Sequence, residues 1–163
     1  MARSSSASAS SSRQPSEADL TEPEAELLNL VLDLIIPGDE DAGAREAGVI
    51  YYIDRQLAGT YQHSREAYRS GLKSVESACA ALHGKSFSAL DPTEQTQLLE
   101  RLEQDDVPRD AWSNQSPSSF FGMVVDHAMQ GFYGSPIHGG NKDFASYKML
   151  GIELPIDYEG RRS

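Results

Sequence analysis

Residues 65–84, REAYRSGLKSVESACAALHG, decide the fold class of this chain. Large apolar side chains recur here after four, three, four and three residues, which is the spacing of one buried helix face. Gly84 follows this run, and glycine is the usual left-handed residue at a helix end. We therefore predict a helix that begins after Ser64 and ends at Gly84. Its predicted inner face comprises Tyr68, Leu72, Val75, Cys79 and Leu82.

Four further stretches carry helical signals. Thr21-Glu22-Pro23-Glu24 matches a capping box, in which the Glu24 side chain reaches back to the Thr21 amide. Asp91-Pro92-Thr93-Glu94 combines a capping aspartate, a proline in the first turn and a second box. The two remaining helices are expected over Ala44–Leu57 and from Ser116 onward. The predicted inner faces are Leu27, Leu28, Val31, Leu34 and Ile35; Ala47, Ile50, Tyr51 and Leu57; Leu98, Leu99 and Leu102; and Phe120, Phe121, Val124, Val125 and Ala128.

These elements predict an all-α fold, a single bundle of about five helices with a glycine-rich loop and an irregular C-terminal tail. The helical domain is expected to span residues 20–163, with a short helical turn near Ser146–Leu150 and Trp112 as a packing anchor. Residues 1–19 form a serine-rich tail that carries too little apolar surface to offset the entropy of ordering, so we expect it to be disordered.

Composition excludes several classes of function. The formal net charge is −11, whereas a protein that binds nucleic acid through its phosphates needs a basic face. No apolar run approaches the ~20 residues of a membrane-spanning helix, so we expect no direct membrane insertion. Cys79 is the only cysteine, which excludes an internal disulfide and a thiolate metal cluster within the chain. We expect Cys79 to be a buried structural thiol.

A second informative stretch is residues 131–141, GFYGSPIHGGN. Glycine allows positive φ and close backbone approach, and proline fixes φ, so this composition predicts a rigid, tightly turned loop. Aromatic side chains on a rigid loop are typical of interface anchors. We predict a partner interface here, while the loop could instead fold back on its own bundle. The predicted interface residues are Phe132, Tyr133, Pro136, Ile137, His138, Gly139, Gly140 and Asn141.

The residue patterns of catalytic and cofactor sites do not favour chemistry within this chain. Asp126 and His127 are adjacent on a helix, so their side chains point about 100° apart and cannot both aim at one ion. The glycine-rich run lacks the spacing of a dinucleotide or phosphate loop and follows a helix rather than a strand. We therefore predict no catalytic, cofactor-binding or metal-binding residue. The alternative is a stand-alone helical enzyme or small-ligand-binding protein that uses Tyr133, His138 and Asn141 in a pocket.

Three segments, in order, resemble one known family. Asp33-Leu34-Ile35-Ile36-Pro37, followed by an acidic loop, Ala47-Gly48-Val49 and Tyr52-Ile53-Asp54, resembles the opening of the gluconate 2-dehydrogenase subunit 3 family. Phe87-Ser88-Ala89-Leu90-Asp91 is similar to its middle segment. Gly131-Phe132-Tyr133 through Gly139-Gly140-Asn141, ending in Leu150-Gly151, looks like its C-terminal signature. The similarity spans residues 24–155.

The resemblance implies a small, non-catalytic subunit in the heteromeric complex of a flavin-dependent sugar or sugar-acid dehydrogenase. The large subunit of such a complex belongs to the glucose–methanol–choline oxidoreductase family and carries FAD, and a multihaem cytochrome c often takes the electrons. The small subunit assists folding, stability or export of the large one, in the manner of a chaperone. This chain would bind no FAD itself.

The family is typically periplasmic, and many relatives carry a twin-arginine signal. Here Arg161-Arg162 lies at the opposite end, and no apolar signal region follows Arg3 or Arg13. The expected location is therefore the periplasm, reached together with the partner, or the cytoplasm.

Overall fold

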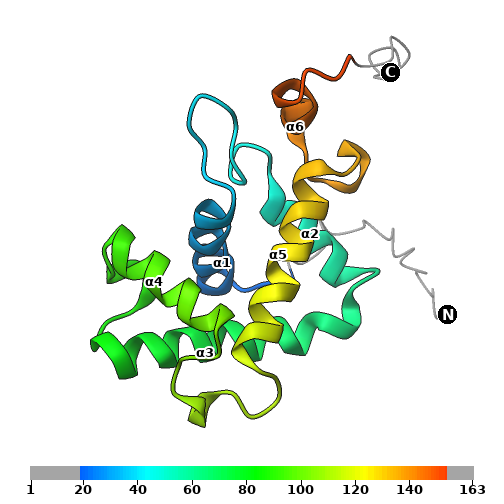
Figure 1. Ribbon diagram of the computed structural model, residues 1–163. Helices are drawn as coiled ribbons and strands as arrows, with labels where there is room; N and C mark the ends of the chain where they lie inside the picture. The colour runs from blue at the N-terminus through cyan, green and yellow to red at the C-terminus, as the bar shows by residue number, and fades with distance from the viewer. Residues whose placement is uncertain (1–18, 154–163) are drawn as a thin grey trace, which may run out of the picture.

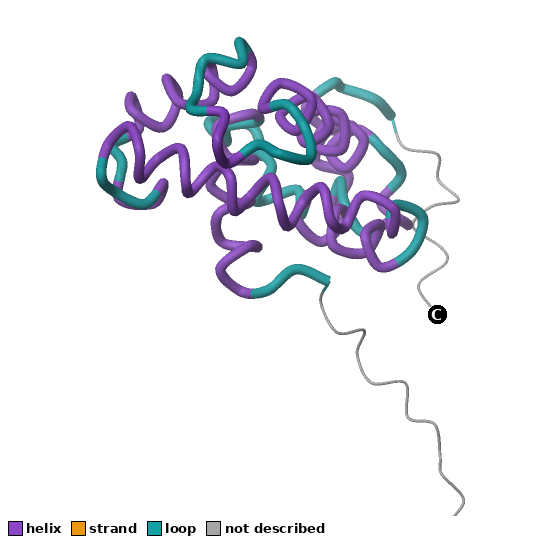
Figure 2. The backbone as a smooth tube through the Cα atoms, turned by 90° about the horizontal axis from the view of Figure 1, so that it is seen from below, coloured by secondary structure: helices purple, strands orange, loops and turns teal. Residues whose placement is uncertain are grey.

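The computed structural model describes residues 19–153, and within them the chain is entirely helical apart from its connections (Figures 1 and 2). Six α-helices confirm the predicted all-α class and the bundle of about five helices. Residues 1–18 of the predicted tail and the segment 154–163 lie outside the described residues. The α-helices are α1 (Glu22–Ile35), α2 (Val49–Ala58), α3 (Arg65–His83), α4 (Pro92–Glu103), α5 (Pro117–Tyr133) and α6 (Ala145–Met149). The 3₁₀ turns are η1 (Gln62–Ser64), η2 (Phe87–Ala89), η3 (Arg109–Ala111), η4 (Pro136–His138) and η5 (Lys142–Phe144).

Helix α5 is the centre of the bundle, since it packs against α1, α2, α3, α4 and α6. Figure 1 shows α3 running across the base of the molecule, with α1 and α5 rising from it. The core lies between these helices, and the Trp112 ring, 8% exposed, closes it beside Phe120, as predicted for a packing anchor. Large side chains that are fully buried include Tyr68, Phe87, Phe132, Leu28, Leu32 and Ile53.

The helix ends follow their sequence signals. The Asp91 carboxylate accepts a hydrogen bond from the Glu94 amide, 2.8 Å, and the Glu94 carboxylate accepts one from the Asp91 amide, 3.0 Å. The Ser116 hydroxyl caps α5 by accepting from the Ser119 amide. Gly84 ends α3 with φ 65°, the left-handed conformation predicted for it.

Two predicted boundaries were wrong. Helix α2 begins at Val49 rather than Ala44, because Gly48 adopts φ 67° and residues 44–48 form turns instead. With Val49 on the buried face, Tyr51 lies about 200° around the helix from it, on the opposite side. Tyr51 is accordingly 70% exposed, whereas the sequence pattern predicts it inward. Close to the start of α2, α5 continues through residues 131–133, which therefore belong to the helix and not to the loop.

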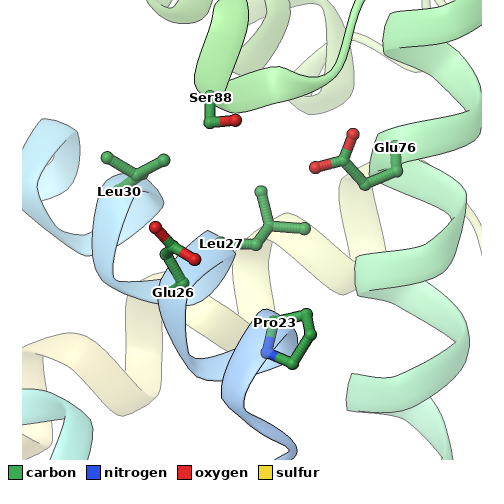
Figure 3. A pocket seen from close by; sticks show the side chains of 6 residues that line it. All are labelled: Pro23, Glu26, Leu27, Leu30, Glu76 and Ser88. Atoms are coloured by element: carbon green, nitrogen blue, oxygen red, sulfur yellow. The ribbon is translucent and has the colours of Figure 1, made fainter.

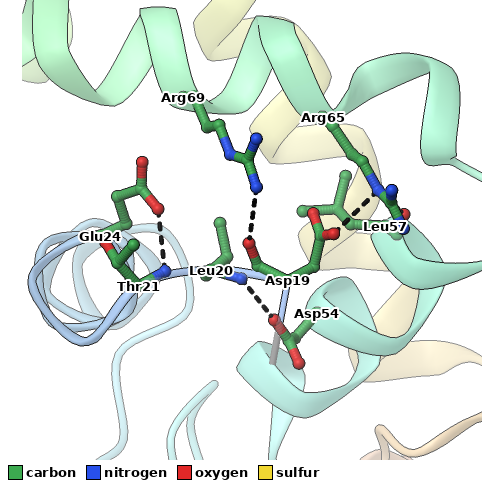
Figure 4. A network of polar contacts seen from close by, with 8 residues as sticks. All are labelled: Asp19, Leu20, Thr21, Glu24, Asp54, Leu57, Arg65 and Arg69. Carbon is green, nitrogen blue, oxygen red and sulfur yellow. Dashed lines mark hydrogen bonds and ion pairs between the residues drawn. The ribbon is translucent and has the colours of Figure 1, made fainter. Parts of the chain in front are cut away.

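Polar contacts hold the beginning of the described chain on α2 and α3 (Figure 4). The Asp19 carboxylate pairs with Arg65, 2.8 Å, and the Leu20 amide donates to the Asp54 carboxylate, 2.9 Å. Leu20 itself is 4% exposed, so the burial of its side chain and the Asp19–Arg65 ion pair hold the same part of the chain on the domain. Asp19, the last residue of the predicted tail, is therefore already held on the domain.

Among residues 19–153, none of the helices combines the length and the hydropathy that crossing a membrane requires.

Candidate functional site

The glycine-rich segment folds back on the end of α5. Gly140 lies against the backbone of Gly131, and a Cβ built on Gly140 would stand 2.1 Å from the Gly131 carbonyl oxygen. No side chain can occupy that space, so glycine at position 140 is a packing requirement. Beyond it, the Lys142 amide donates to the Ala47 carbonyl, 2.9 Å, which ties the segment to the turns that precede α2.

The Asn141 side chain holds this segment in place through two hydrogen bonds. It is completely buried and adopts φ 45°, a conformation that asparagine tolerates better than most residues. Its Nδ2 donates to the Gly134 carbonyl, 2.9 Å, and its Oδ1 accepts from the Ser146 amide, 2.9 Å. One side chain thus joins the end of α5 to the first turn of α6.

A third attachment holds the loop to α2. The Arg55 guanidinium donates to the Ile137 carbonyl, 3.2 Å. Gly139, at φ 103°, lies beside the Tyr51 backbone, since a Cβ there would stand 3.6 Å from the Tyr51 oxygen. Tyr51 and the Pro136–His138 turn are therefore neighbours, although more than eighty residues separate them.

The structure divides the eight predicted interface residues into two groups. Phe132 (1% exposed), Gly140 and Asn141 are buried within the chain itself, and Pro136 and Gly139 are partly covered. Tyr133 (44% exposed), Ile137 (62%) and His138 lie on the surface. The segment therefore both locks its own bundle and presents side chains outward, and the interface itself stays a prediction.

Sequence reasoning missed Tyr51, which is the most exposed large apolar side chain among the described residues. Helix α2 buries Val49, Ile50, Tyr52, Ile53 and Leu57, so the alternative stripe through Val49, Ile53 and Leu57 was the pattern that would have placed Tyr51 outward. We call Tyr51, Tyr133, Ile137 and His138 the loop patch. These four side chains belong to α2, the last turn of α5 and the η4 turn.

Charge is distributed unevenly along the chain. Tyr133, Ile137 and His138 of the loop patch lie in its neutral part, and Tyr51 lies in its acidic part. Residues 19–110 hold 19 acidic and 8 basic side chains, whereas residues 111–152 hold two of each. Acidic side chains repel one another and hold water, while a neutral apolar surface is the kind that partner proteins cover. Three of the four loop-patch side chains thus come from a stretch of sequence that carries no net charge.

A second constellation, not predicted from the sequence, joins α2, η1, α3 and α5. The Tyr68 hydroxyl and His127 Nδ1 are 2.9 Å apart, and the Tyr61 ring stacks on His127 with centroids 4.3 Å apart. The Tyr61 hydroxyl donates to Gln130 Oε1, and the Tyr52 hydroxyl lies 3.3 Å from the same oxygen. Burial raises the pKa values of Tyr52 and Tyr68 and lowers the pKa of His127, so all three side chains are neutral near pH 7. Tyr68 bonds to His127, and Tyr52 bonds to Tyr61 and Gln130, so the cluster connects the helices through hydrogen bonds.

Within the described part of the chain, no three His, Cys, Asp or Glu side chains gather in a way that could hold a metal ion. A pocket of about 160 Å³ lies between α1 and α3, with Glu26 and Glu76 facing it across Leu27 (Figure 3). Ligand sites are commonly about 300–1,000 Å³, so this pocket is small for one. Glu76 is also engaged, because its carboxylate accepts from the Phe87 amide, 3.1 Å.

The alternative ligand site required Tyr133, His138 and Asn141 around one pocket. Both ends of the Asn141 side chain are used within the fold, and the residue has no exposed surface. Tyr133 and His138 are on the surface instead. The three side chains are therefore not brought together in an open site.

Comparison with known proteins gives one finding. A family model described as gluconate 2-dehydrogenase subunit 3 matches residues 22–153, which covers α1 to α6. No curated protein and no solved structure matched the chain. The match includes the three resembling segments and ends where the described residues end. Because it spans most of the chain, this chain belongs to the gluconate 2-dehydrogenase subunit 3 family.

Proposed function

We propose that this chain is the non-catalytic small subunit of a flavin-dependent sugar or sugar-acid dehydrogenase. Its partner would be a large subunit of the glucose–methanol–choline type, which carries FAD, and a cytochrome c would accept the electrons. Family membership supports a small subunit of a dehydrogenase complex. The observation that carries the proposal further is the loop patch, whose exposed Tyr and Ile side chains lie on and beside the held glycine-rich segment.

The physical case rests on preorganisation. Gly140 against Gly131, Asn141 between Gly134 and Ser146, and Arg55 on Ile137 hold the loop from three directions. A loop already fixed in one conformation loses little entropy when a partner binds it, so more of the contact energy is left for affinity. Exposed Tyr and Ile side chains supply apolar area to such a contact.

The role proposed for the subunit is to support folding, stability or export of the large subunit. A flavoprotein subunit that leaves an apolar surface in water is prone to aggregate, and a small partner that covers that surface would keep it soluble. The chain itself would perform no catalytic step and hold no FAD.

Co-expression tests this proposal. The candidate large subunit is produced with and without this chain, and its soluble yield, flavin absorbance per protein and dehydrogenase activity are measured. We expect all three to fall when this chain is absent. Equal yield, flavin content and activity in its absence would show that the accessory role is wrong.

A further inference from the structure

A groove separate from the loop patch lies between α1, α4 and α5, with a volume of about 250 Å³. Leu34 and Ile35 from the last turn of α1 form one side, and Leu99 of α4 lies across from them. Phe121 and Val125 of α5 complete the apolar lining. We call this the α1–α4–α5 groove.

The groove exists because α5 carries more apolar surface than the bundle covers. Phe120, Val124 and Ala128 are at most 3% exposed and face the core. Phe121 and Val125, each one residue further along the helix, form a second apolar stripe that is only half buried. The sequence pattern predicted both stripes as inner faces, and the structure buries only the first completely.

The rim of the groove is negative. Glu100 and Glu103 are exposed at its edge, and neither forms an ion pair with a described residue. The groove also lies at the C-terminal ends of α1 and α4, where helix carbonyls add partial negative charge. The last turn of α1 contains no basic residue, and Arg101 in the last turn of α4 is paired with Asp106, 3.1 Å.

We infer that the α1–α4–α5 groove docks a basic segment of a partner protein, one that inserts one or two large apolar side chains between flanking Lys or Arg residues. The volume is below that of a typical small-molecule site and suits inserted side chains. Apolar lining with unpaired carboxylates at the edge is complementary to such a segment, because its cations can reach the rim while its apolar side chains leave water.

A second copy of this chain is a poorer occupant. Each copy has a formal charge of −11, and a two-fold interface at this groove would bring the acidic rims of both copies toward each other. The inference does not depend on the proposed function, because the groove shares no residue with the loop patch.

Methyl-detected NMR of the full chain with a defined peptide tests the inference. The probe is a 14-residue amphipathic helix of Leu and Lys, and its control replaces every Leu with Gln while keeping the Lys residues. We expect the Leu–Lys peptide to shift the methyl signals of Leu34, Ile35, Leu99 and Val125, and the Gln–Lys peptide to leave them unchanged. Binding should weaken as salt is raised.

Charge reversal at the rim supplies the matched comparison. Glu100→Lys with Glu103→Lys should weaken Leu–Lys peptide binding by roughly 10-fold, since both carboxylates face the peptide cations. Glu66→Lys with Asp110→Lys changes the net charge equally at exposed positions outside the groove lining, and should weaken it by less than about 3-fold. All four positions are exposed, and circular dichroism will verify that both variants fold.

Several outcomes would overturn the inference. These are the absence of binding, methyl shifts spread over α3 rather than the groove, equal binding of the Gln–Lys peptide, or equal loss in the two charge-reversal variants. Groove methyl signals that shift when residues 154–163 are deleted would assign the groove to this chain's own C-terminal segment. A dimer in sedimentation that Glu100→Lys with Glu103→Lys dissociates would assign it to a second copy.

Discussion

The backbone of Gly140 lies against the carbonyl of Gly131, so closely that a Cβ on Gly140 would stand 2.1 Å from that oxygen. This contact closes the glycine-rich segment onto the end of α5. Because the obstacle is backbone, it cannot rotate away as a side chain could, and the segment itself would have to move.

Gly140→Ala should therefore lower the free energy of unfolding by about 1–3 kcal/mol, the usual cost of overpacking a close contact. Urea denaturation followed by circular dichroism measures it. Gly122→Ala is the matched control at an open position of α5, since a Cβ there meets nothing within 4 Å. That variant should raise the free energy of unfolding by about 0.5–1 kcal/mol, because alanine is the better helix former. Equal effects of the two substitutions would contradict the assigned close approach.

Asn141→Ala should lower the free energy of unfolding by about 2–4 kcal/mol. It removes two hydrogen bonds and leaves the buried Ser146 amide and the Gly134 carbonyl without their side-chain partner. Asn141→Gly removes the same bonds but tolerates φ 45°, so it should recover about 1 kcal/mol relative to alanine. If the alanine and glycine variants were both as stable as the parent protein, the two Asn141 hydrogen bonds would make no net contribution to the free energy of unfolding.

Stability should fall as the pH is lowered below about 6.5, through the titration of His127. Burial lowers the pKa of His127 in the folded state below the ordinary value of 6.5, with Asp126 opposing and His63 adding to the shift. The unfolded chain therefore binds the proton first, so the contribution of His127 is complete above pH 6.5 and is lost as the pH falls through the folded pKa. Thermal unfolding between pH 7.5 and pH 5 measures this dependence. His127→Gln should flatten it, and an unchanged slope in that variant would assign the effect to other groups.

Cys79 should be unreactive in the folded protein. Its side chain has no exposed surface, and burial, reinforced by the nearby Glu76 carboxylate, raises the pKa of its thiol to about 12. The thiolate, which is the reactive form, is therefore scarce and shielded at pH 8. A thiol reagent such as DTNB should react with about one equivalent in urea and with much less than one in buffer. Rapid labelling of the folded protein would show that α3 opens readily around this residue.

Tyr133→Ser with Ile137→Ser should leave the free energy of unfolding within about 0.5 kcal/mol of the parent value, because both side chains are on the surface. In the co-expression experiment the same pair should reduce recovery of the complex, since the partner would lose apolar contact area. Lys73→Ser with Lys85→Ser changes two exposed residues of α3 and the turn after it, and should not reduce recovery. Undiminished recovery with the loop-patch pair would exclude these two side chains as anchors.

Much of the fold was predictable because helix ends are local. Asp91 with Glu94, Ser116 and Gly84 act within one turn of the chain, so the residues themselves specify where α3 ends and where α4 and α5 begin. Periodicity likewise identified Tyr68, Leu72, Val75 and Cys79, all of which are buried. The candidate site was predictable only in part, since composition located the glycine-rich segment but did not separate its buried from its exposed residues.

The sequence by itself determined that this chain is helical, where most helices begin and end, that its net charge is acidic, and to which family it belongs. Only the tertiary structure decided that Asn141 and Phe132 face inward, that Tyr51 faces outward, that Tyr61 stacks on His127, and that part of the apolar surface of α5 stays uncovered. The physical reason is the distance along the sequence over which each effect acts. Caps and periodicity depend on neighbours a few residues apart, whereas burial depends on which distant segment comes to lie against a side chain.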